Sequence, residues 1–191
     1  NDGMCGRIPY LHRLHRNQGF SLIEVLVTLV LLGVGLLGAQ QMHANALRQH
    51  RESQQQARAD QLAAALAERL RGHAAMAQLP GGPYVLDARL DHAPSVPADC
   101  VSTPCLLPEQ AAAHDIASWM QRVAQELPGA RVQVCPDAQP LDAQGLPDWS
   151  CDGASTGPIR LLAIKLGWPT RHDAEMVRPG TVLLASTGAP P

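Results

Sequence analysis

An apolar run near the start of the chain constrains its fold more than any other feature. Residues 20–39 (FSLIEVLVTLVLLGVGLLGA) contain no basic side chain and one acidic side chain, Glu24. At about 1.5 Å per residue a helix of this length spans roughly 30 Å, the thickness of a bilayer core. Arg7, Arg13 and Arg16 precede the run and, by the positive-inside rule, predict a cytoplasmic N-terminus. We expect one membrane pass, with the rest of the chain on the far side.

Three interpretations of this segment compete. A secretory signal peptide has an apolar region of about 7–15 residues before an A-x-A-like site, and here a longer run precedes Ala44-Asn45-Ala46. A plain membrane anchor explains the length, but a carboxylate in the bilayer costs about 2.5–3.5 kcal/mol and needs a reason. The favoured interpretation rests on Gly19, Phe20 and Glu24 at the edge of the run, because this segment resembles the class III signal of type IV prepilins.

The resemblance implies how the chain is processed. A prepilin peptidase and N-methylase would cut after Gly19 on the cytoplasmic side, and Phe20 would become the N-methylated first residue of the mature protein. Glu24 would be the fifth residue, which in pilins is thought to face the terminal amine of a neighbouring subunit. A buried carboxylate is tolerable when it is paired and hydrogen-bonded, so the resemblance gives Glu24 a role in assembly.

The sequence divides into four predicted parts: a leader peptide at 1–19, a transmembrane and assembly helix at 20–39, a periplasmic half of that helix at 40–73, and a globular head at 74–191. Without the leader's three arginines and one aspartate, 12 basic and 16 acidic side chains remain, a formal net charge of −4. The acidic balance and an aromatic content of 3% argue against a nucleic-acid partner.

Four cysteines lie in the predicted exported part, Cys100, Cys105, Cys135 and Cys151, whereas Cys5 lies in the leader. An even number of exported cysteines indicates disulfides formed in an oxidising compartment such as the periplasm. Three pairings are possible. Sequence proximity and turn-rich intervening segments favour Cys100 with Cys105 and Cys135 with Cys151. A four-thiolate zinc site would need paired C-x-x-C knuckles, which the spacing lacks.

The apolar run continues into a segment of helix formers without proline, from Gln40 to Gly72. We therefore expect one helix from near Ser21 to near His73. Pro80-Gly81-Gly82-Pro83 ends the helical region. The helix carries an apolar stripe that predicts contact with the head: Leu62, Ala65, Leu66 and Leu70.

A second helix is expected between about Pro108 and Leu127, stopped by Pro128-Gly129, with Trp119 packed inward. Its apolar stripe consists of Ala112, Ile116, Trp119, Met120, Val123 and Leu127.

Alternating patterns predict the strands of the head. Tyr84-Val85-Leu86 is at most a short strand, Arg131–Cys135 a half-buried one, and Ile159–Trp168 a longer one with Lys165 exposed. A third short strand is expected through Thr181 to Ala185. The element order predicts an α+β, type IV pilin-like fold: a long N-terminal helix, its first half transmembrane, packed on a small antiparallel sheet head with a second short helix.

The sequence of the predicted head resembles one group within the type IV pilins. Cys100-Val101-Ser102-Thr103-Pro104-Cys105, then the helix with Asp115 and Trp119, then Leu127-Pro128-Gly129 and a strand ending in Cys135, resembles the PilV-type minor pilins. This resemblance implies a low-abundance subunit that joins other minor pilins to prime pilus assembly and ends near the fibre tip.

The implied partners are the prepilin peptidase, other minor pilins, the major pilin and the inner-membrane assembly platform. The implied location is the inner membrane, with the head in the periplasm, and later the pilus fibre at the cell surface. Two alternatives stay open: a minor pseudopilin of a type II secretion system, and a membrane-anchored periplasmic binding module that does not polymerise.

Enzymatic motifs are missing from the sequence. The eight histidines are dispersed without an H-E-x-x-H pair, and there is no G-x-S-x-G elbow. We expect Asp87, Asp91, Asp137 and Asp142 to hydrogen-bond local backbone in turns rather than to bind calcium. No catalytic residue, metal or cofactor is predicted, and the chain is expected to be a substrate of processing enzymes.

Overall fold

The computed structural model describes residues 21–96, 100, 105–151, 158–171 and 173–188. The predicted leader, with Gly19 and Phe20, lies outside the described residues. The chain forms two compact units, residues 1–48 and residues 49–191. Helix α1, Leu22–Gly72, has the boundaries that the sequence predicts, and it contributes to both units.

The first unit holds the apolar part of α1. Every large apolar side chain from Leu22 to Leu37 is exposed, from 44% at Val25 to 91% at Leu22. Among the described residues, α1 is the one helix that is long and apolar enough to cross a membrane. An apolar helix with no buried face needs lipid or another protein around it, because water would solvate this surface at a high free-energy cost.

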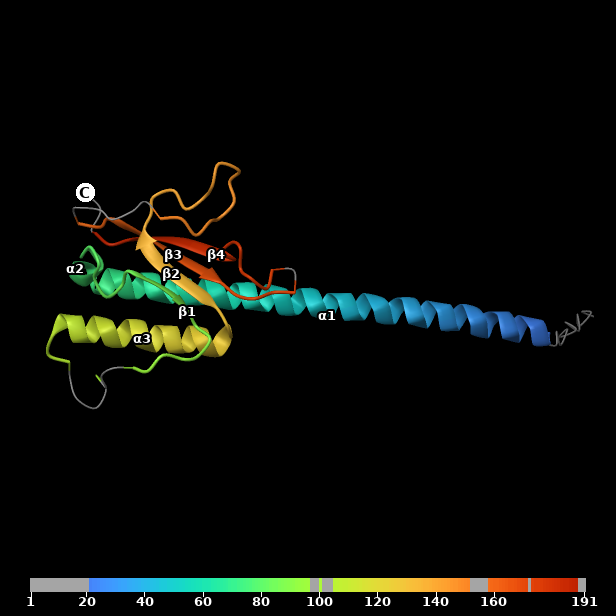
Figure 1. Ribbon diagram of the computed structural model, residues 1–191. Coiled ribbons are helices and arrows are strands. Elements are labelled where there is room, and N and C mark those ends of the chain that lie inside the picture. Colours follow the sequence, from blue (N-terminus) through green and yellow to red (C-terminus); the bar gives the residue numbers. More distant parts are fainter. Residues whose placement is uncertain (1–20, 97–99, 101–104, 152–157, 172, 189–191) are drawn as a thin grey trace, which may run out of the picture. The chain divides into compact units, whose positions relative to one another are not determined.

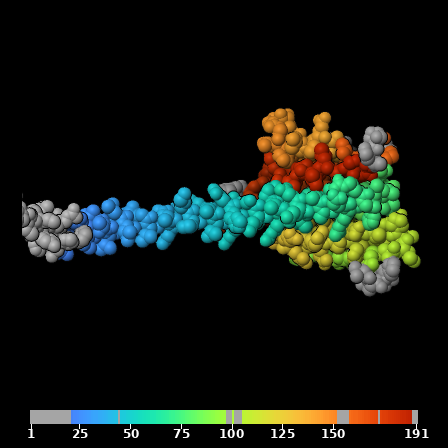
Figure 2. Space-filling model, turned by 180° about the vertical axis from the view of Figure 1, so that it is seen from behind, coloured from blue at the N-terminus to red at the C-terminus, as the bar shows by residue number. Residues whose placement is uncertain are grey.

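The second unit is an α+β head. It contains residues 49–72 of α1, a short helix α2 (Ala74–Ala77), helix α3 (Pro108–Glu126) and four strands. Residues 49–72 of α1 lie between α3 and the sheet in both Figure 1 and Figure 2. The Trp119 indole of α3 is fully buried and donates a hydrogen bond to the Leu62 carbonyl of α1 at 2.8 Å.

The sheet is antiparallel throughout, in the order β1-β2-β3-β4. Strands β2 and β3 are the two inner strands, and Val134 of β2 pairs with Ile164 of β3. One face of the sheet joins α1 and α3 in a single apolar core through Val132, Val134, Leu162, Ile164 and Leu166. The four strands are β1 (Leu86–Arg89), β2 (Arg131–Pro136), β3 (Leu161–Gly167) and β4 (Thr181–Ser186).

The predicted apolar stripes of α1 and α3 differ from the observed buried faces in two details. Ala65 is only half-buried, and Ala59, Ala63 and Ala67 complete the buried face of α1 instead. Small alanines let neighbouring chain segments approach the helix closely. Met120 of α3 is likewise half-buried, while the other members of its predicted stripe are buried.

The strand predictions are corrected at three places. Strand β1 begins at Leu86, because Tyr84 belongs to a turn and buries its ring in the core. Asp87, expected in a turn, lies within β1 opposite Gln133. Lys165, expected to be exposed, is 0% exposed. Alternation does turn Lys165 to the face away from α1, opposite to Ile164 and Leu166, but residues 137–151, which follow β2, cover that face.

Candidate assembly helix and disulfide loop

Glu24 lies in the first turn of α1, and its side chain is exposed. Its amide donates to the Ser21 carbonyl at 3.0 Å, which helps to begin the helix. A carboxylate in this position interacts favourably with the positive end of the helix dipole. The Glu24 side chain, which has no polar partner among the described residues, is therefore exposed beside the N-terminal end of an apolar helix, where another polar group could reach it.

The structure places one of the three predicted assembly and processing residues. Glu24 is described, whereas Gly19 and Phe20 lie outside the described residues. Their processing roles therefore stay predictions.

Two disulfides join the four cysteines of the head in the favoured pairing. Cys100 and Cys105 are bonded with their Cα atoms 5.1 Å apart, and Cys135 and Cys151 with theirs 6.2 Å apart. Cys135 lies in β2, so the second bond attaches the end of the following loop to the sheet. We call residues 137–150 the disulfide loop.

The disulfide loop carries its own hydrogen bonds. The Asp142 carboxylate accepts from the amides of Gln144 and Leu146, both at 2.9 Å. It also pairs with the Arg178 guanidinium at 2.6 Å. The amide hydrogen bond from Leu146 and the pairing with Arg178 lower the pKa of Asp142. Asp137 and Asp142 thus bond local backbone, as their sequence context predicts, and each also binds a basic side chain.

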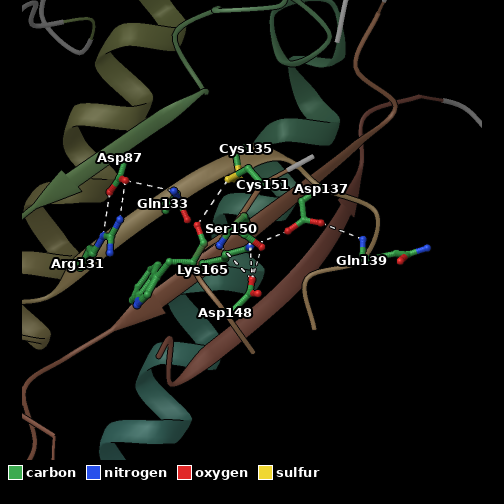
Figure 3. Close-up of a disulfide and its surroundings, with 11 residues drawn as sticks. Asp87, Arg131, Gln133, Cys135, Asp137, Gln139, Asp148, Ser150, Cys151 and Lys165 are labelled. Atoms are coloured by element: carbon green, nitrogen blue, oxygen red, sulfur yellow. Dashed lines mark hydrogen bonds and ion pairs between the residues drawn. A yellow bond between two sulfur atoms is a disulfide. The ribbon is translucent and has the colours of Figure 1, made fainter. Parts of the chain in front are cut away.

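Lys165 lies beneath the disulfide loop and is the only lysine in the sequence. Its ammonium group is 2.6 Å from Asp137 Oδ2, and both side chains are nearly inaccessible, at 0% and 2% exposure. It also donates to the Ser150 carbonyl and lies 3.9 Å from Asp148 Oδ1 (Figure 3). Hydrogen bonds from Ser150 hold the pKa of Asp148 below its usual range, with Lys165 adding to the effect. A buried ammonium therefore has acidic partners from both ends of the loop.

Trp149 attaches the same loop to the rest of the head. Its indole nitrogen donates to the Met176 carbonyl at 2.9 Å, and the Arg131 guanidinium lies 4.4 Å from the ring centroid. Arg131 is itself held by Asp87 through two hydrogen bonds of 3.0 and 2.7 Å. A Cβ atom at Gly167 would lie 2.7 Å from the Trp149 ring, so this glycine allows the close approach.

Sequence reasoning missed this cluster of Lys165, Asp148 and Trp149. The available signals were a single lysine in an otherwise apolar strand and a cysteine-bounded segment rich in aspartate. Within the part of the chain that the structure describes, no three histidine, cysteine or acidic side chains are grouped so as to hold a metal ion. Lys165 pairs with Asp137 and Asp148, so the charged part of the cluster is an internal ion-pair network.

Comparison with known proteins gives one finding for the N-terminal segment. A family model described as the prokaryotic N-terminal methylation motif matches residues 14–40. The matched residues include Gly19, Phe20 and Glu24, so the chain carries the motif of type IV pilin-like and pseudopilin proteins, a structural rather than an enzymatic class. The motif implies processing by a prepilin peptidase and assembly by pilus or pseudopilus machinery. No curated protein and no solved structure matches the chain.

Proposed function

We propose that this protein is a minor pilin of the PilV type, which helps other minor pilins to prime and assemble a type IV pilus. The observation that carries the proposal is the methylation motif at the start of a membrane-length helix whose only acidic side chain in the apolar run is Glu24. The inner membrane would hold the subunit by α1, with the head in the periplasm, until it enters the fibre near the tip.

Glu24 supplies the physical reason for assembly in this proposal. Its carboxylate is exposed in the single chain and would be costly in a lipid environment without a partner. The N-methylated amine of Phe20 on a neighbouring subunit would pair with it. The carboxylate then favours the assembled state over the isolated subunit, because only assembly provides the opposite charge.

The head supports a subunit role. Its two disulfides suit an oxidising compartment such as the periplasm. Its charged cluster is satisfied internally. The Cys100–Cys105 bond, the Trp119 helix and the strand that contains Cys135 correspond to the block that resembles PilV-type pilins.

Intact-mass analysis of the membrane-extracted protein tests the first part of this proposal. We expect loss of everything through Gly19 and one added methyl group on Phe20. A Gly19→Ala variant is the matched control and should stay uncut. An uncut wild-type chain would instead indicate a membrane-anchored periplasmic module that does not polymerise.

A minor pseudopilin of a type II secretion system is the second candidate, because pseudopilins carry the same N-terminal motif. Deletion of the gene distinguishes the two. We expect loss of surface pili and of twitching motility with normal protein secretion, and recovery on complementation. Normal piliation with defective secretion would favour the pseudopilin.

A further inference from the structure

All the polar partners that the structure gives Lys165 lie within one covalently closed segment. Asp137 is two residues after Cys135, and Ser150 and Asp148 are one and three residues before Cys151. The ammonium therefore lies between the two ends of a loop that the Cys135–Cys151 bond closes (Figure 3). Burying an ammonium is costly without such partners, so the position of both ends determines whether Lys165 can stay inside.

The two ends are not held equally. Asp137 directly follows β2, and the ladder between β2 and β3 fixes it close to Lys165. The Cys151 end follows a non-repetitive loop. Among the described residues it is attached by the disulfide, by the Trp149 contacts with Met176 and Arg131, and by Arg178, which pairs with Asp142 and donates to the Pro147 carbonyl at 3.0 Å. Of these attachments only the disulfide is covalent, and it is one residue from the carbonyl that accepts from Lys165.

We propose that the Cys135–Cys151 disulfide is a redox-sensitive latch that keeps the chain's only lysine buried. A dithiol reductant would transfer two electrons and two protons to the bond, giving two thiols, and would itself become a disulfide. The segment with Asp148 and Ser150 then moves away from Lys165, and hydration of the ammonium drives the opening. Oxidation by a disulfide donor reverses the change. The latch does not depend on the proposed role in pilus assembly.

The other disulfide provides a matched control. Cys100 and Cys105 are five residues apart, and no partner of Lys165 that the structure describes lies between them. Replacing Cys100 and Cys105 with serine removes a disulfide from the same chain without touching the latch.

The experiment uses the single lysine as its own probe. The full chain in detergent micelles is treated with an amine-acetylating reagent, and an arginine-specific digest isolates residues 161–171, which contain Lys165 and no other lysine. We expect the acetylation rate of Lys165 to rise at least about tenfold in the Cys135→Ser, Cys151→Ser variant. Without the disulfide, the loop opens locally more often, and the reagent then reaches the Lys165 amine. In the Cys100→Ser, Cys105→Ser variant the rate should stay within about twofold of wild type.

Hydrogen exchange of the same samples distinguishes local opening from general unfolding. We expect the amides of β3 and β4 to keep their protection while Lys165 becomes reactive. Loss of protection in these strands together with acetylation would show that the disulfide holds the whole head, and would overturn the local latch. An unchanged acetylation rate would also overturn it, because the Trp149 contacts would then be sufficient.

A variant without the Lys165–Asp137 charges tests whether hydration of the ammonium drives the opening of the reduced loop. Lys165→Met with Asp137→Asn removes both charges and keeps an acceptor for the Gln139 amide, which donates to Asp137 at 2.9 Å. With no ammonium to hydrate, the reduced loop should stay closed. Alkylation of the Cys151 thiol should then be at least about fivefold slower in the reduced variant than in the reduced wild-type chain. Equal alkylation rates would contradict the role of the ammonium.

Discussion

The two parts of α1 use apolar side chains in opposite ways. From Leu22 to Leu37 the large apolar residues are exposed, whereas Leu62, Leu66 and Leu70 are buried against the head. The first part therefore needs a partner that the single chain does not supply, and the second part has its partner within the chain. Composition indicates the role of the first part, whereas the helical spacing of Leu62, Leu66 and Leu70 predicts that the second part contacts the head.

The largest contrast should come from the same substitution made in both parts. Leu66→Ala removes a fully buried side chain and should lower the free energy of unfolding of the head by about 2–5 kcal/mol. Leu29 is 63% exposed. Leu29→Ala should therefore change the free energy of unfolding of the head by no more than about 0.5 kcal/mol from the wild-type value. Urea unfolding in micelles, followed by the fluorescence of the three tryptophans, all of which lie in the head, measures both. Equal losses would contradict the division of α1 into two parts.

Periodicity and turn residues were sufficient to predict α1, α3, β2, β3 and β4, but not the short helix α2 or the bounds of β1. The ends of α1 and α3 follow from the proline-free run and from the prolines at 108 and 128, and the strands β2, β3 and β4 follow from alternation. The antiparallel α+β fold and the disulfides are confirmed in the structure. The individual elements depend on residues that are close in sequence, whereas the sheet pairs residues that are distant in it, such as Val134 and Ile164.

The environment of Lys165 could not be predicted in the same way. Alternation assigns Lys165 correctly to the face opposite Ile164, but it does not say what covers that face. The covering loop has no period, and its contacts with Met176 and Arg178 join residues about 30 positions apart. For the same reason Asp87 was mistaken for a turn residue, since its partner Arg131 is on the neighbouring strand.

Alkaline pH should act on the head and not on the apolar part of α1. Burial raises the pKa of Tyr84 to about 12, with the Asp115 carboxylate adding to the effect. The unfolded chain would ionise this tyrosine near its ordinary value of about 10. The stabilisation is therefore complete below about pH 10 and is lost as the pH rises towards 12, by on the order of 2 kcal/mol.

Urea unfolding between pH 8 and pH 12 would measure this loss. Tyr84 is the only tyrosine after the predicted leader, so Tyr84→Phe is a direct control. This variant loses the hydrogen bond to His73, which is 2.8 Å long, and should be less stable at neutral pH by about 1 kcal/mol. Its stability should fall less steeply above pH 10. An identical alkaline slope in both proteins would show that another group causes it.

In the exposed part of α1, substitution of Glu24 should have the most specific effect on assembly. Glu24→Ala removes a carboxylate from an apolar segment, so membrane insertion should be unchanged or slightly improved. Incorporation into fibres should fall about tenfold, because a polar pair between membrane helices is worth about 1–2 kcal/mol. The ratio of the protein in sheared fibres to that in the membrane fraction measures the change.

Glu52→Ala is the matched control, because Glu52 is also an exposed glutamate of α1 but lies outside the apolar run. It should leave both insertion and incorporation near their wild-type levels. If Glu24→Ala is incorporated as well as Glu52→Ala, the carboxylate has no role in docking. The exposed apolar surface alone would then account for assembly, and the cost of placing Glu24 in the membrane would have no compensation in the fibre.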